Sequence, residues 1–132
     1  MSNKSDFENS SSLLDNASVS IHYIDQYGTI LWANDQELEI LGYSEEEYIG
    51  KNIGEFIEDK IVSKDILQRL LNGEKIHNYP VVINGKDCKI YFIISSNVYL
   101  ENNTFIHTRC FNVDIPKEAY EIIKEDSEYF KN

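Results

Sequence analysis

Three histidines and two cysteines are the side chains of this chain best suited to metal binding or nucleophilic chemistry. His22, His77 and His107 lie in three separate segments, without the close spacing that is typical of zinc sites. Each is therefore expected to be a histidine at the surface or at a strand edge, and no metal site is predicted. The sequence has no Ser-His-Asp order, glycine-rich phosphate loop or catalytic carboxylate pair. The acidic run over 45–47 is explained by a helix start, where negative charge is favourable. We therefore expect no enzyme activity from this chain.

The two cysteines, Cys88 and Cys110, are expected to be reduced thiols. Two cysteines do not form the dense framework of a disulfide-stabilised domain. In the strand register described below, the two residues lie on the order of 20 Å apart along the strand, which is far beyond disulfide reach. Both thiols should therefore react with a thiol reagent in the unfolded protein.

Length and charge limit the classes of partner. A chain of 132 residues with 42% hydrophobic residues fits one domain with one core. Its apolar runs are too short to span a bilayer, and its first residues lack the apolar core of a secretory signal, so a cytoplasmic location is expected. The net charge of −11, with 12 dispersed Lys and Arg residues, argues against nucleic acid or an anionic membrane as the main partner.

Capping residues predict several short helices in the first half of the chain. Asn34 can cap a helix and form a capping box with Glu37, and Ser44 with Glu47 repeats the pattern. A turn is expected over 52–58 and a longer helix over 64–71, which ends at Gly73. Before them, residues 1–12 read as a disordered lead-in and 13–17 as a short helical turn.

Strands occupy both ends of this helical region. Alternation and turn residues predict strands over 20–25, 29–33, 79–83, 86–98 and 104–113. Asn84-Gly85 predicts a two-residue hairpin turn. Pro116 then opens a final helix over 117–130, because proline is tolerated in a first helical turn. The order of elements indicates an α+β fold, with helices on one face of an antiparallel sheet.

Several segments of the sequence resemble the PAS family. Residues 25–34 (DQYGTILWAN) are similar to its second-strand motif, and residues 41–50 (LGYSEEEYIG) to its LGYS-x-E-E-x-IG segment. Ser96-Asn-Val and residues 105–111 (FIHTRCF) resemble the last two strands in PAS domains of bacterial sensor histidine kinases. Asp114-Ile115 matches the start of the closing D-I-T motif, whose Thr is replaced here by Pro116.

The resemblance implies a sensory or signal-relay domain of a two-component-type regulator. It divides the chain into the lead-in over 1–12, a PAS domain over 13–115 and a signalling or linker helix over 116–132. It implies a five-stranded antiparallel sheet with short helices packed on one face and a C-terminal helix. It also implies that Asp114 couples the sheet to this helix and could cap it, with a downstream output domain or partner protein as the receiver.

The resemblance also allows two cofactors to be considered. Flavin-binding PAS domains carry a reactive Cys in a G-x-N-C segment, and the matching stretch here ends in Ile53, which cannot form the adduct. Oxygen-sensing haem domains carry a His on the long helix, and the stretch 64–71 has none. We therefore expect neither flavin nor haem, while an unidentified small ligand stays possible.

The last two strands sort their side chains onto two faces, because strand side chains alternate. If residues 101–103 form a three-residue loop, Ile94 lies opposite Cys110, Phe92 opposite Asn112 and Ser96 opposite Thr108. A two-residue turn would instead shift the register by one and mix the faces. The resemblance places these six residues toward the helices, where the candidate cavity is also closed by Tyr48, Ile53, Phe56 and Ile57.

The opposite face of these two strands is strongly apolar. We expect it to contact a second copy of the chain, the final helix or the N-terminal segment, because apolar faces of this size are usually covered. The resemblance implies a homodimer through this face, whose candidate contact residues are Tyr91, Ile93, Tyr99, Phe105, Phe111 and Val113.

Three functions stay open at this point. The first is a domain that senses a small ligand in its core cavity or relays a signal by dimerising. The second is a pure protein–protein interaction module with a filled core, and the third is a small enzyme on a similar fold. An open cavity would favour the first, a filled core the second, and an acid or base with a shifted pKa in the cavity the third.

Overall fold

The structure is a computed structural model that describes residues 19–131. The predicted lead-in over 1–12 and the predicted turn over 13–17 lie outside the described residues. In chain order the elements are β1 (Ser20–Ile24), β2 (Ile30–Ala33), α2 (Asp35–Leu41), α3 (Glu45–Tyr48), the 3-10 turn η1 (Ile53–Glu55), α4 (Lys60–Leu71), β3 (Ile76–Asn84), β4 (Lys89–Glu101), β5 (Thr104–Asp114), α5 (Lys117–Asp126) and the 3-10 turn η2 (Glu128–Phe130).

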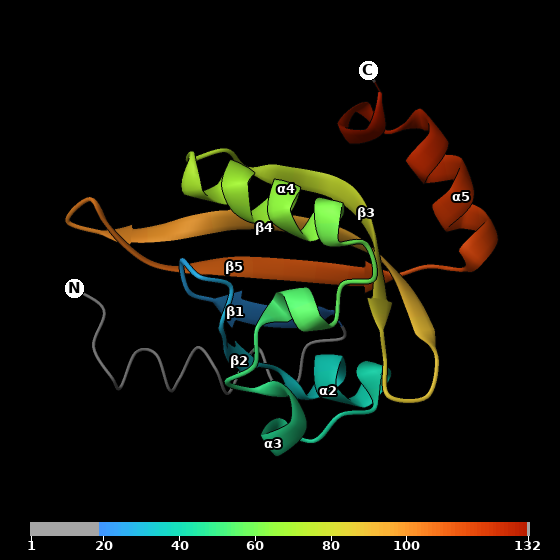
Figure 1. The fold of residues 1–132 in the computed structure, drawn as a ribbon, viewed down its shortest axis with the longest axis horizontal. Coiled ribbons are helices and arrows are strands. Elements are labelled where there is room, and N and C mark those ends of the chain that lie inside the picture. Colours follow the sequence, from blue (N-terminus) through green and yellow to red (C-terminus); the bar gives the residue numbers. More distant parts are fainter. Residues whose placement is uncertain (1–18, 132) are drawn as a thin grey trace.

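The five strands form one antiparallel sheet in the order β2-β1-β5-β4-β3. The last strand of the chain, β5, is therefore the central strand, between β1 and β4. Helices α2, α3 and α4 cover one face of the sheet, and α5 extends beyond the ends of β4 and β5 (Figure 1). The predicted α+β architecture is confirmed. None of the helices within 19–131 is long and apolar enough to cross a membrane.

Capping side chains set most of the helix starts. Ser44 and Glu47 form the predicted capping box of α3, and Asn34 caps α2 as predicted. The prediction for Glu37 is wrong, because its carboxylate turns into the core instead of back to the Asn34 amide. The long helix α4 begins four residues before the predicted start, since Asp59 accepts hydrogen bonds from the first free amides of the helix.

The β4–β5 hairpin turns over two residues, Asn102 and Asn103, rather than the predicted three. Both have positive φ, 52° and 64°, which asparagine tolerates and which suits the twist of a tight hairpin. A bulge between Tyr99 and Leu100 then shifts the register a second time. The predicted pairs are therefore wrong by two residues, and Cys110 faces Ser96, not Ile94. Two single shifts preserve parity, so both faces carry the predicted side chains.

The β3–β4 hairpin has a four-residue loop over 85–88 rather than the predicted two-residue turn. The Gly85 amide donates to the Cys88 carbonyl oxygen at 2.9 Å. A Cβ on Gly85 would lie 2.7 Å from that oxygen, so this glycine serves a close backbone approach. Cys88 consequently lies exposed in the loop, while Cys110 is buried, and both thiols are free.

The C-terminal segment folds back on the domain at one corner. Tyr120 of α5 is buried, and its ring centroid lies 5.0 Å from that of Tyr91. In η2 the Tyr129 ring stacks on the Tyr79 ring at 4.4 Å, and the Tyr129 hydroxyl oxygen accepts a hydrogen bond from the His77 amide at 2.9 Å. The predicted cap by Asp114 is wrong, because the N-cap position of α5 is Pro116, which has no side-chain oxygen.

Candidate functional site

One row of core-facing side chains runs across three neighbouring strands. His22 on β1 pairs with Cys110 on β5, and Cys110 pairs with Ser96 on β4, so all three project from the same face of the sheet. His22 is only 2% exposed, and Cys110 and Ser96 are also buried. The expectation of a surface or edge histidine is wrong for His22, because β1 lies inside the sheet between β2 and β5.

Glu37 approaches this row from the helical layer. Asn34 fixes its position, because the Asn34 Oδ1 accepts from the Glu37 amide and from the Ile21 amide, both at 3.0 Å. The Asn34 amide nitrogen also donates to the Val19 carbonyl oxygen at 2.8 Å. One asparagine therefore starts α2 and holds it against β1. As a result, the fully buried Glu37 side chain lies over His22.

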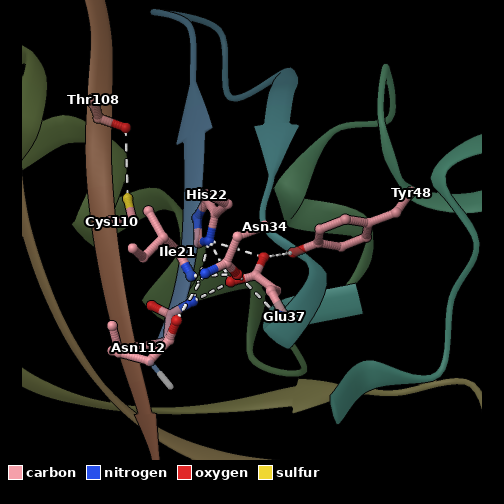
Figure 2. A network of polar contacts seen from close by, with 9 residues as sticks. Ile21, His22, Asn34, Glu37, Tyr48, Thr108, Cys110 and Asn112 are labelled. Atoms are coloured by element: carbon pink, nitrogen blue, oxygen red, sulfur yellow. Dashed lines mark hydrogen bonds and ion pairs between the residues drawn. The ribbon is translucent and has the colours of Figure 1, made fainter. Parts of the chain in front are cut away.

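The Glu37 carboxylate collects three side-chain partners (Figure 2). The Nδ1 atom of His22 lies 3.0 Å from both carboxylate oxygens. The Tyr48 hydroxyl donates to Oε2 at 2.6 Å, and the Asn112 amide nitrogen donates to Oε1 at 2.6 Å. A buried carboxylate requires this degree of compensation, because an unpaired charge in the core is costly.

This environment shifts the proton equilibria of its members. Burial lowers the pKa of His22, but the Glu37 carboxylate and the Cys110 sulfur outweigh it, so the pKa lies well above the ordinary value. Burial together with the Glu37 charge raises the pKa of Tyr48 well above its ordinary value. The arrangement therefore favours an imidazolium–carboxylate pair, with Tyr48 kept protonated as a donor.

The Cys110 thiol lies at the other end of this network. Burial raises its pKa, but the charge of His22 and the nearby polar side chains of Ser96 and Thr108 outweigh burial, and the pKa is lowered. The Thr108 hydroxyl is 3.5 Å from Sγ. The Ser96 hydroxyl acts on the thiol electrostatically but makes no hydrogen bond of normal geometry. Its oxygen is thus a buried polar atom without a partner, which is uncommon in a folded protein.

A small cavity lies against the row. Its volume is about 20 Å³, and it is bounded by His22, Ser96 and Cys110 on the sheet side. The other lining residues come from β1, β3, β4, η1, the segment after η1, and α4: Ile24, Ile53, Ile57, Ser63, Ile66, Leu67, Ile83 and Ile94. A space of this size accommodates about one water molecule.

All ten predicted cavity residues are buried, but only half of them line this cavity. Ile53, Ile57, Ile94, Ser96 and Cys110 reach it. The remaining predicted residues fill the core instead, or bind within the polar network: Tyr48, Phe56, Phe92, Thr108 and Asn112.

Sequence reasoning missed His22 and Glu37 as members of the site. For Glu37 a signal existed, since it lies four residues before the buried Leu41 and therefore on the same side of α2. For His22 the sequence offers no signal. Every residue of β1 is buried, so its side chains do not alternate between an apolar and a polar face.

The opposite face of the sheet, here called the outer face, carries the predicted contact residues. Tyr99 belongs to a ring ladder there, with His107 stacked at 5.2 Å and Arg109 at 4.2 Å over its ring. Tyr91 is partly covered by α5. Phe111 is 37% and Val113 54% exposed on the central strand, while Ile93 and Phe105 are half-buried.

Two further observations concern ligands. Among residues 19–131, no cluster of three or more His, Cys, Asp or Glu side chains could hold a metal ion. A wider groove of about 600 Å³ lies on the surface between η2, the end of α5 and the bulge of β3, and it includes Arg69, His77 and Asn78. It is separate from the core row.

Comparison with known proteins decides the family. The PAS fold family matches residues 8–113, which is most of the chain. The chain belongs to the PAS family. No curated protein matches the sequence. Among solved structures, the PAS domain of an HTR-like protein from Haloarcula marismortui is 22% identical with a TM-score of 0.68, over 85% of this chain and 97% of that one.

Two other PAS-fold structures extend this comparison. A PAS domain from a two-component sensor histidine kinase is 16% identical with a TM-score of 0.70, over 85% of this chain and 98% of the other. The Rhodobacter sphaeroides LOV protein is 15% identical with a TM-score of 0.73, over 87% and 70%. At these identities the likeness establishes the fold, and the chain is a PAS sensory domain.

Proposed function

We propose that this PAS domain relays a signal by self-association through its outer face, with a core filled by its own side chains. The observation that carries this proposal is the size of the core cavity, about 20 Å³. Pockets for organic ligands typically have volumes of about 300–1,000 Å³. Tyr48, Phe56 and Phe92, predicted as cavity walls, occupy the interior. This favours the filled-core alternative over a domain that senses an organic ligand.

The residues around the core do not fit the two cofactors considered from the sequence. Ile53 lines the cavity at the position where a flavin-binding relative would carry its reactive thiol. The buried residues of α4 are Val62, Ile66 and Leu70, none of which ligates haem iron. The purified protein is expected to show no flavin or haem absorbance. A stoichiometric flavin spectrum, a Soret band or a copurifying organic molecule in native mass spectrometry would overturn the filled-core proposal.

The proposed self-association uses the exposed part of the outer face. Phe111 and Val113 are exposed on β5, and beside them Ser95 and Ile93 on β4 are half-buried. None of these four side chains is charged. In a two-fold dimer a patch meets its own copy, so an uncharged apolar patch is complementary to itself. A second copy of this chain is therefore the partner that the surface suits best.

The test is a single substitution in this patch. Phe111→Glu places a carboxylate against its symmetry mate and should reduce the sedimentation mass from dimer to monomer, with an unchanged circular dichroism spectrum. Leu31→Glu, at a similarly exposed apolar position on edge strand β2, is the matched control and should stay dimeric. A wild-type chain that sediments as a monomer at high micromolar concentration would contradict the proposal.

We further infer a cytoplasmic setting in a two-component-type regulator. The resemblance to PAS domains of sensor histidine kinases and the solved relative from such a kinase support this assignment. Asp114 is the exposed last residue of β5, three residues before α5 begins. Since it does not cap α5, we propose that any coupling to an output domain passes through the packing of Tyr120 on Tyr91.

A further inference from the structure

Cys110, His22 and Glu37 have the arrangement of an activated nucleophile. A thiol within hydrogen-bonding reach of an imidazole, which is itself oriented by a carboxylate, is the general pattern for raising nucleophilicity. Here the Glu37 carboxylate holds Nδ1 of His22 at 3.0 Å, and His22 is the cross-strand partner of Cys110, so the imidazole and the thiol project side by side from the same face of the sheet. The proposed self-association does not use this group of residues, which lies on the other face of the sheet.

The cavity supplies a place for a reactant beside the sulfur. It is bounded by Cys110, by His22 and by the Ser96 side chain, whose buried hydroxyl has no partner. An unpartnered hydroxyl in the wall of a cavity can donate to, or accept from, a small polar molecule. At about 20 Å³ the space holds about one water molecule, so it admits only a reactant close to water in size, such as hydrogen peroxide, and excludes bulky reagents. Ser63 and Leu67, also in the wall, are partly exposed, so the cavity lies close beneath the surface.

We propose that Cys110 is a modification site for small hydroperoxides, with hydrogen peroxide as the reactant that fits the cavity, and that Ser96 and His22 assist its oxidation to a sulfenic acid. This inference goes beyond the proposed relay function and does not depend on it, because the modification is measured on the sulfur itself.

The chemistry balances without another reactant. The Cys110 thiolate attacks one oxygen of hydrogen peroxide, so an S–O bond forms as the O–O bond breaks. Sulfur loses two electrons and the peroxide gains them. The departing hydroxide takes the proton of the His22 imidazolium and leaves as water. The proton first lost by the thiol goes to solvent, so overall one thiol, one imidazolium and one peroxide give one sulfenic acid, one neutral imidazole, one water and one proton.

The product would change the buried charge balance. When the His22 proton leaves, the Glu37 carboxylate keeps only its two neutral donors, Tyr48 and Asn112. An uncompensated carboxylate in the core is unfavourable, so α2 and β1 lose part of what holds them together. Oxidation at Cys110 is thereby connected to the packing of the helical layer on the sheet.

The test uses a Cys88→Ser chain, in which Cys110 is the one remaining thiol. The folded protein is treated with hydrogen peroxide, the peroxide is removed by catalase, and the protein is unfolded in dimedone, which traps sulfenic acid. Intact mass then gives the rate at which Cys110 gains the dimedone adduct. We expect this rate to be about ten-fold or more above that of Cys88 in a Cys110→Ala chain, because Cys88 lies exposed in a loop without an activating imidazole.

Two variants test the assigned roles, and a second oxidant tests the size of the cavity. Ser96→Ala and His22→Gln, both in the Cys88→Ser chain, should each slow oxidation by about ten-fold or more, with native circular dichroism spectra. tert-Butyl hydroperoxide should react with the unfolded chain but not with the folded one. The proposal is overturned if folded Cys110 resists hydrogen peroxide, if Ser96→Ala reacts as fast as its parent, or if the bulky peroxide reacts equally well with the folded chain.

Discussion

The pair formed by Glu37 and His22 places two opposite charges where no solvent reaches them. Such a pair contributes little net stability when complete, since desolvation offsets attraction. Removal of only one of the two residues is strongly destabilising, because the remaining charge must be buried alone or neutralised. The hydrogen bonds from Tyr48 and Asn112 are aimed at the Glu37 carboxylate, and they too depend on its charge.

Glu37→Gln should therefore destabilise the protein by about 3 kcal/mol in urea unfolding. The imidazolium of His22 loses its counter-charge, and Tyr48 and Asn112 lose a charged acceptor. Glu39→Gln is the matched control, because Glu39 is exposed on the same helix, and it should change stability by less than about 0.5 kcal/mol. Equal changes in the free energy of unfolding for the two substitutions would mean that breaking the buried pair does not destabilise the protein.

The pH dependence of stability follows from the direction of the His22 shift. Its folded-state pKa is raised above the ordinary 6.5, so its stabilisation is complete below that pH and is lost as pH rises through the folded-state pKa. The free energy of unfolding should therefore fall as pH rises above about 6.5 toward the raised folded-state pKa of His22. The lowered pKa of Cys110 contributes with the opposite sign.

Two histidine variants separate the contributions. His22→Gln should abolish the fall of stability at alkaline pH. In His107, burial lowers the pKa, so its neutral form is favoured in the folded state and its contribution is lost only as pH drops below the ordinary value. His107→Gln should therefore keep the alkaline fall. A wild-type stability that is flat over this range would exclude a charged His22.

The residues of the site show which inferences a sequence permits. The parity of β4 and β5 placed Ser96, Cys110 and Asn112 on the core side, because alternation survives an even shift of register. The partner of Cys110 could not be predicted in the same way. It depends on a bulge between Tyr99 and Leu100, and no glycine or other turn-forming residue at that position predicts the bulge.

At the scale of elements, caps and hairpin turns define the boundaries. The capping box predicted at Ser44 and Glu47 recurs at Asn52 and Glu55, where each side chain accepts a hydrogen bond from the other residue's backbone amide. The Asn-Gly hairpin signal at 84–85 failed, because Gly85 is used for backbone proximity to Cys88. The two asparagines 102 and 103, which lack a glycine, instead form the tight turn.

Substitution of Asn103 tests this turn. Asparagine tolerates its φ of 64°, whereas in alanine the Cβ would lie too close to the backbone. Asn103→Ala should therefore destabilise the protein by about 1 kcal/mol. Asn97→Ala, at an exposed position within β4, should change stability by less than about 0.5 kcal/mol. Urea unfolding measures both. If the two variants are equally stable, Asn103 does not hold the left-handed conformation in solution.

At the scale of the whole molecule, fold and family could be predicted from the order of elements and the spacing of motifs. The exposed outer face was also foreseen, because parity placed Phe111 and Val113 away from the helices. The path of the C-terminal segment could not be predicted. It is set by contacts between residues distant in sequence, such as Tyr129 with Tyr79 and Tyr120 with Tyr91.

The net charge of −11 predicts how the affinity of the proposed dimer depends on salt. Bringing two such chains together is opposed by long-range repulsion, whereas the patch around Phe111 is uncharged and insensitive to salt. Salt screens repulsion beyond a Debye length, which falls from roughly 14 Å at 0.05 M to about 4 Å at 0.5 M. The dimer should therefore bind several-fold more tightly at about 0.5 M than at about 0.05 M sodium chloride, as measured by sedimentation equilibrium. Phe111→Glu should stay monomeric at both concentrations, and a dimer that weakens with salt would instead point to an interface held by ion pairs.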